Sequence, residues 1–334
     1  MGMQGQGSPE VATHGTHAHP LVAAVRSSTR LELIGLVVML GFYALLLGTF
    51  AISWPTHDAA LQMRVTSVGT FVLYVVCVGH CLSSRGARAT IGFFALSWII
   101  PFCAEYLGSN YGLIFGSYDY TGTMGPSIGG VSLLIPFSWS ILQYGALTLI
   151  CWLLGLGGDR RGATWPGRIG WSALVALAVG VAVTSLDLMT DPAYVSNVWQ
   201  QVLGVAPWWW WDGGAYLPNL QVWQGAGGIP VENFFGWAAV TFVVIFVFLL
   251  VFDGHGRRLD RLVDVVGLLL YGFSLVAVTL ELAEMSWYDP GLPEAAVIGI
   301  FAAGPLAIVG VVKFAQMYWT PPSPGTTPGP SGTR

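Results

Sequence analysis

Long apolar segments alternate with polar or glycine-rich connections along most of the chain. Each segment has roughly the 20 residues that a helix needs to cross the hydrocarbon core of a membrane. This pattern predicts a bundle of about eight transmembrane helices, and therefore an all-α integral membrane protein. The predicted spans cover residues 33–53, 65–82, 90–107, 132–156, 169–190, 233–252, 264–284 and 294–316.

The connections between these spans are too short to hold a soluble domain, so residues 31–318 are expected to form one polytopic membrane domain. Residues 1–30 are rich in Gly, Ser and His and contain no apolar run, which predicts a disordered N-terminal tail rather than a cleaved signal peptide. Residues 319–334 are rich in Pro and Gly and are expected to form a second disordered tail.

The distribution of charge predicts an orientation. Charged residues make up 9% of the chain, against roughly 25% in a soluble domain. With the N-terminus in the cytoplasm, every Lys and Arg except Arg64 falls in a cytoplasmic segment, as the positive-inside rule requires. Eight spans then place both termini in the cytoplasm. The net charge is −4 and the basic residues are scattered, so nucleic acid is not an expected partner.

Carboxyl groups collect on the opposite, outer face. Three predicted helices end in acidic residues on that face: Glu105, then Asp187 and Asp191, then Glu281 and Glu284. Ionisable groups at the edge of the hydrocarbon are expensive and usually functional. They indicate a site that handles protons or cations. Polar loops at a membrane surface are the simpler explanation for the carboxylates that lie outside the helices.

Asp187 and Asp191 are four residues apart and share one face of the fifth predicted helix, which is expected to end near Pro192. Their like charges repel, which favours a neutral carboxylic acid at one of the two positions. The structural alternative is an interhelical hydrogen bond with Thr184 or Asn233. The four cysteines lie in apolar runs, which predicts buried free thiols.

Two stretches rich in aromatic residues adjoin these carboxyl groups. After Glu105, glycines alternate with aromatic residues as far as Tyr118 and Tyr120. The connection from Val195 to Glu232 holds six tryptophans. Tryptophan faces attract cations and also suit a flat, conjugated hydrocarbon. Both stretches predict the wall of a pocket, and an interfacial aromatic belt is the alternative.

Five motifs follow one another between about residues 90 and 315: Glu105-Tyr-Leu-Gly108, Phe115-Gly-Ser-Tyr-Asp-Tyr120, Pro136 with Trp139, Asp187 with Asp191-Pro192, and Ile229-Pro-x-x-Asn233-Phe-x-Gly-Trp237. In this order they resemble the carotenoid 1,2-hydratase family, which includes the γ-carotene 1′-hydratases. The stretch 217–227 departs from the family pattern because it looks inserted.

The resemblance implies a multi-pass enzyme of a bacterial cell membrane that needs no organic cofactor. Such an enzyme, a hydro-lyase, adds water across the terminal C1–C2 double bond of an acyclic carotenoid ψ-end. Its expected partners are the carotenoid substrate and the lipid bilayer, and other carotenoid biosynthesis enzymes are further candidates.

The residues suit this chemistry independently. Hydration of the alkene needs an acid that protonates C2, a carboxylate that deprotonates water, and π faces that stabilise the cation at C1. Asp187 and Asp191 are the candidate acid/base pair, with Glu105 and Glu281 as second choices. The candidate substrate-binding residues, tryptophans for the cation and polar groups for the water, are Tyr118, Tyr120, Trp139, Trp199, Trp211, Asn233 and Trp237.

Other functions fit parts of the pattern. A carotenoid cyclase would begin with the same protonation. A proton- or cation-coupled transporter would be expected to carry carboxylates deeper in its helices and internal repeats. The Asp187-x-x-x-Asp191 spacing resembles a metal-binding motif of membrane prenyltransferases, but the second aspartate-rich motif and the basic residues for phosphate are missing from this face, so no metal is expected. A desaturase would need a redox cofactor, and the chain has no dinucleotide fingerprint.

Overall fold

The computed structural model describes residues 19–56, 58–155, 164–252 and 259–319. These residues are mostly helical, and among them eight helices are long and apolar enough to cross a membrane, as the hydropathy pattern predicts. The spanning elements are α2 (Arg30–Thr56), α3 (Ala59–Arg85), α4 (Ala87–Tyr111), α5 (Leu134–Leu153), α6 (Trp165–Val195), α8 (Val231–Val251), η1 (Leu262–Val265) continued by α9 (Val266–Met285), and α10 (Leu292–Tyr318).

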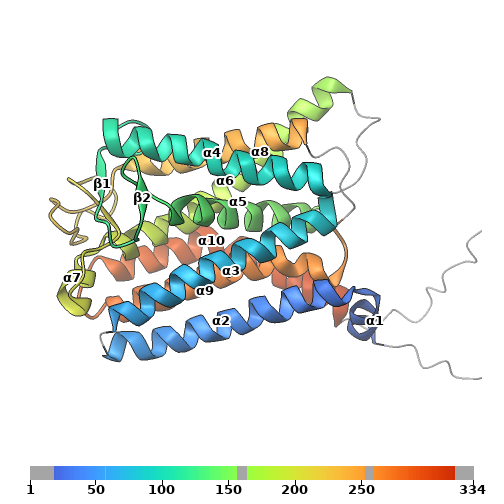
Figure 1. Cartoon of the computed structure of the whole chain (residues 1–334), viewed down its shortest axis with the longest axis horizontal. Coiled ribbons are helices and arrows are strands. Elements are labelled where there is room, and N and C mark those ends of the chain that lie inside the picture. The colour runs from blue at the N-terminus through green and yellow to red at the C-terminus, as the bar shows by residue number, and fades with distance from the viewer. Residues whose placement is uncertain (1–18, 57, 156–163, 253–258, 320–334) are drawn as a thin grey trace, which may run out of the picture.

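The long helices lie side by side in one bundle, as Figure 1 shows. One end of the bundle holds the short helix α7 (Val198–Leu203) and the strands β1 (Tyr118–Tyr120), β2 (Ser127–Ile128), β3 (Val131–Ser132) and β4 (Trp209–Trp211). We call it the strand end. The short helix α1 (Pro20–Ser27) lies at the opposite end (Figure 1).

Helix α1 corrects one prediction. A disordered tail was expected over residues 1–30, but Pro20–Ser27 form a helix. Pro20 stands at the first helical position, where a fixed φ favours the helix, and the side chain of His19 accepts a hydrogen bond from the backbone N–H of Leu21. Most of the remaining residues of the predicted tails, 1–18 and 320–334, lie outside the described residues.

The pairing of β1 with β4 was not predicted from the hydropathy pattern. The two strands are antiparallel, with Tyr118 opposite Trp211 and Tyr120 opposite Trp209. They join the connection after α4 to the connection after α7. Side chains alternate between the two faces of a strand, so Tyr118 and Tyr120 share one face and Asp119, between them, is exposed.

Close contact between α6 and α8 brings the aspartates of α6 near Asn233 of α8. At Gly180, an added Cβ would lie 3.0 Å from the carbonyl oxygen of Ala238. Small residues let transmembrane helices approach closely. This crossing sets the distance between the end of α6, which carries Asp187 and Asp191, and the start of α8, which carries Asn233.

The cysteines differ in exposure. Cys77, Cys81 and Cys151 are buried, as predicted, but Cys103 is exposed, so the prediction is wrong for that residue. An apolar run predicts that a helix crosses the membrane. It does not establish which side of the helix packs against its neighbours and which side faces away from them.

Candidate functional site

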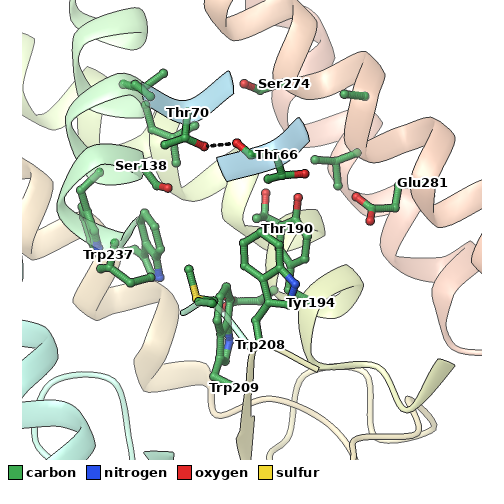
Figure 2. Close-up of a pocket in the computed structure, with 18 of the residues that line it drawn as sticks. Thr66, Thr70, Ser138, Thr190, Tyr194, Trp208, Trp209, Trp237, Ser274 and Glu281 are labelled. Atoms are coloured by element: carbon green, nitrogen blue, oxygen red, sulfur yellow. Dashed lines mark hydrogen bonds between the residues drawn. The ribbon is translucent and has the colours of Figure 1, made fainter. Parts of the chain in front are cut away.

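A cavity of about 200 Å³ lies near the strand end, between the helices and beneath the paired strands. Helices α2, α3, α4, α5, α6, α8 and α9 contribute side chains to it, and so do β1 and β4. No Lys or Arg occurs among the described residues that line it. In the view of Figure 2, Trp237 and Glu281 lie on opposite sides, with Thr190 and Tyr194 between them.

The cavity contains most of the predicted site residues. Those that line it are Glu105, Tyr118, Tyr120, Trp139, Asp191, Trp211, Asn233, Trp237 and Glu281. Asp187 and Trp199 are not among the lining residues. Trp199 is fully buried, and its indole N–H donates to the carbonyl oxygen of Ala193 at 2.8 Å. Trp199 therefore packs behind the residues that line the cavity and does not itself line it.

Glu105, near the end of α4, accepts hydrogen bonds from three side chains. Its Oε1 accepts from the indole N–H of Trp139 at 2.8 Å. Its Oε2 accepts from the hydroxyl of Tyr120 at 2.7 Å and from that of Tyr118. The shared strand face of the two tyrosines and the end of α4 at Gly112, which has a left-handed conformation, allow this convergence.

The two tyrosines keep their protons at ordinary pH. Burial, with the nearby Glu105 carboxyl as a further cause, raises the pKa of Tyr118 and of Tyr120 well above the usual value of a phenol. Each hydroxyl therefore remains a hydrogen-bond donor. The donors hold the Glu105 carboxyl in one place at the cavity wall.

Asp187 and Asp191 share a single donor. The side-chain amide of Asn233 donates to Oδ2 of Asp187 at 3.2 Å and also to Oδ2 of Asp191. Both carboxyl groups are almost completely buried. Asp191 lines the cavity and Asp187 lies one helical turn away along α6. The interhelical bond with Asn233, considered above as a structural alternative, is therefore present, whereas the Thr184 hydroxyl has no hydrogen-bond partner in the described residues.

Glu281, near the end of α9, is the third carboxyl in the wall of the cavity. Its Oε1 accepts a hydrogen bond from the side-chain amide of Gln62 on α3 at 3.2 Å, and Tyr194 of α6 lines the same cavity. Neither Gln62 nor Tyr194 was predicted as a site residue. Tyr194 follows Asp191 by three residues, so helical spacing was a signal that could have found it. For Gln62, a polar residue near a helix end, the sequence has no comparable signal.

The aromatic side chains form a layered wall. Trp139 and Trp237 stack with their ring centres 3.8 Å apart and their planes at 12°. Tyr194 and Trp208, which also line the cavity, stack with ring centres 4.2 Å apart. Trp211 donates from its indole N–H to the carbonyl oxygen of Phe115 at 3.1 Å, which fixes its orientation. Trp208 and Trp209 also line the cavity, although they were not among the predicted binding residues.

Hydroxyl groups complete the wall. Four of them donate to backbone carbonyl oxygens one helical turn earlier, at 2.8–3.2 Å, namely Thr70, Ser138, Thr190 and Ser274. Their hydrogens are thus engaged by the helices, and their lone pairs remain available. A water molecule or a developing cation in the cavity would meet oxygen acceptors and π faces, with no cationic side chain among the described lining residues.

The fold and the cavity define a polytopic membrane protein with a buried site of carboxyl groups and tryptophans. The chain belongs to the carotenoid biosynthesis protein family, whose family model matches residues 61–303. It is similar to bisanhydrobacterioruberin hydratase of Haloarcula japonica, with 27% identity over 234 residues that cover 69% of this chain and 68% of the relative. No solved structure matches the chain. The resemblance to carotenoid hydratases that the motifs predict is confirmed.

Proposed function

We propose that this protein is a hydro-lyase that adds water across the terminal C1–C2 double bond of an acyclic carotenoid ψ-end. The observation that carries the proposal is the position of Asp191, a buried carboxyl group that faces a tryptophan-lined cavity and has a second carboxyl group behind it. The name of the relative in Haloarcula japonica supports the reaction class, and the family supports a carotenoid substrate.

The cavity suits the end of a long hydrocarbon. Binding sites for drug-sized ligands usually measure about 300–1,000 Å³, and this cavity measures about 200 Å³. We therefore propose that only the ψ-end is enclosed and that the rest of the polyene lies outside the cavity, toward the lipid. A long substrate could then present its end to the site without leaving the bilayer.

Asp191 is the proposed proton donor. The two aspartates share one amide donor, and no Lys or Arg lines the described cavity wall. The state of lowest free energy for such a buried pair has one proton shared between the two carboxyl groups. Asp191 faces the cavity, so it would deliver that proton to C2 of the alkene. Asp187 would hold Asp191 in place and share its proton.

The tertiary cation at C1 would be stabilised by the aromatic wall. The Trp139–Trp237 stack, which lines the cavity, offers a π surface of the kind that attracts cations, at about 0.5–2 kcal/mol. The Glu105 carboxyl, held by its three donors, adds oxygen acceptors on the same side through its bond to Trp139. Groups that are fixed before the charge develops need no reorganisation when it does.

The proposed setting is a bacterial cell membrane with both termini in the cytoplasm. The basic residues, which favour this orientation, would then lie opposite the strand end. The site would face the outer leaflet, where the end of a bilayer-spanning carotenoid meets the interface.

The proposal is tested by expressing the chain in bacteria that accumulate lycopene or γ-carotene and analysing the pigments by chromatography and mass spectrometry. We expect a more polar product heavier by one water, absent with Asp191→Asn. Asp119→Asn, which removes an exposed carboxyl group from β1, is the matched control and should keep the product. A product of unchanged mass with altered absorption would identify a cyclase, and unchanged pigments would contradict the proposal for these substrates.

A further inference from the structure

Two buried oxygen atoms next to the cavity have no hydrogen-bond partner among the described residues: Oε2 of Glu281 and Oε1 of Gln62. The two side chains are only 1% and 2% exposed, respectively. They are already joined through the other atoms of their head groups, since Nε2 of Gln62 donates to Oε1 of Glu281 at 3.2 Å. The two unpaired oxygens therefore belong to neighbouring groups.

With Glu281 as a carboxylate, both unpaired atoms are acceptors, so neither can satisfy the other. Buried polar atoms without a partner are rare because each costs about 1–3 kcal/mol. A water molecule has two O–H groups and can donate to two acceptors at once, and buried waters commonly bridge such pairs. Glu281 lines the cavity, so the lone pairs of a water bound in this way would be available to a substrate there.

The other carboxyl groups in or near the described cavity wall are less suited to bind a water molecule. Three donors already occupy the oxygens of Glu105. Asp191 accepts from Asn233. Asp187 has an unpaired Oδ1, but its side chain is not part of the cavity wall. Among the described lining carboxyl groups, Glu281 is thus the one with an unpaired buried oxygen.

We infer that Glu281 and Gln62 bind the water molecule that becomes the hydroxyl group of the product. This inference rests on the proposed function. It assigns proton donation and water binding to different carboxyl groups. Asp191 supplies the proton, and the water attacks from the Glu281 carboxylate. Gln62 acts as a positioning residue, because it holds both the carboxylate and the water.

The chemical step balances as follows. Asp191 transfers its proton to C2, the C1–C2 π bond supplies the electron pair, and a tertiary cation remains at C1. The water oxygen bonds to C1 as one of its protons passes to the Glu281 carboxylate. That proton must return to the Asp187–Asp191 pair before the next turnover. The sum is addition of one water molecule to the alkene.

The test separates protonation from water capture by running the reaction of the detergent-purified protein in D₂O with lycopene. A cation that forms but is not captured can lose a proton from C2, which returns the alkene with deuterium at that carbon. For Glu281→Gln, whose amide cannot accept a proton, we expect hydration to fall by about 100-fold, while deuterium still enters the recovered lycopene. Gln62→Met should show the same separation with a smaller loss.

Two control variants distinguish a loss of water capture from a loss of protonation and from the loss of any carboxyl group. Glu294→Gln removes an exposed carboxyl group near the same end of the bundle and should behave as the unaltered protein. Asp191→Asn should lose hydration and deuterium incorporation together. Full hydration by Glu281→Gln would overturn the inference. Loss of both hydration and deuterium incorporation in that variant would also overturn it, because Glu281 would then act in the protonation step. If the unaltered protein neither hydrates nor labels the alkene, the proposed function fails and the inference fails with it.

Discussion

The side-chain amide of Asn233, in the first turn of α8, donates a hydrogen bond to the carboxyl group of Asp191, near the end of α6. The same nitrogen reaches Asp187. One amide thus orients two carboxyl groups from another helix, in a region where the described cavity wall has no cationic side chain. The proposed proton donor therefore depends on the contact between α6 and α8.

Removal of this amide should abolish most of the activity. In Asn233→Ala the two carboxyl groups lose their common donor, at a cost of about 1–3 kcal/mol for the unsatisfied buried groups. We expect lower thermal stability in detergent and little hydrated product in the pigment assay. Asn219→Ala, which removes an exposed amide from the strand-end loops, is the control. Equal product from both variants would show that the orientation by Asn233 is unimportant.

The two aspartates should differ in their effect on turnover. Asp191→Asn removes the proposed proton donor, so we expect a loss of about 100-fold or more in the rate of hydration. Asp187→Asn leaves an amide that can still bond to its neighbours behind the cavity wall, so a loss of about tenfold or less is expected. Rates are measured on purified protein at matched concentration. The assignment of the donor is contradicted if Asp187→Asn is the more damaging change.

The stacked pair of tryptophans should contribute through its π surface. Trp237→Leu keeps an apolar side chain but removes the ring, so the rate should fall between about two- and thirtyfold, which corresponds to 0.5–2 kcal/mol of lost cation stabilisation. Trp237→Phe should recover part of the loss. Trp287→Leu, at a residue that is 88% exposed, is the control for the loss of a tryptophan. No difference between Trp237→Leu and Trp287→Leu would exclude this role for the ring.

The spacing of α6 and α8 can be tested without touching the site. In Gly180→Ala the new Cβ would lie 3.0 Å from the backbone oxygen of Ala238, which forces the helices apart at a cost of about 1–3 kcal/mol. We expect a lower melting temperature and less product, because Asp191 would move relative to Asn233. Gly79→Ala is the matched helical control, since its Cβ would meet nothing within 4 Å. It should be neutral or slightly stabilising, and equal melting of the two variants would refute the packing argument.

Much of the architecture follows from hydropathy alone. A helix that crosses a bilayer must satisfy its own backbone groups and present about 20 apolar residues, so the lengths of the apolar runs predict the spanning helices found in the described residues. The four-residue spacing of Asp187 and Asp191 likewise predicts that they share a helix face. Such properties belong to a single helix and need no knowledge of its neighbours.

The partners of the carboxyl groups depend on the tertiary structure. Gln62 and Glu281 are 219 residues apart in the chain, and the tyrosines reach Glu105 because β1 pairs with β4. Trp199 resembles the other tryptophans of its segment in sequence, yet it bonds to Ala193 instead of lining the cavity. The sequence by itself thus determined the spans, the acidic helix ends and the family. Only the packing of helices decided which side chains share a cavity, because periodicity describes the faces of one helix and not the helix that each face meets.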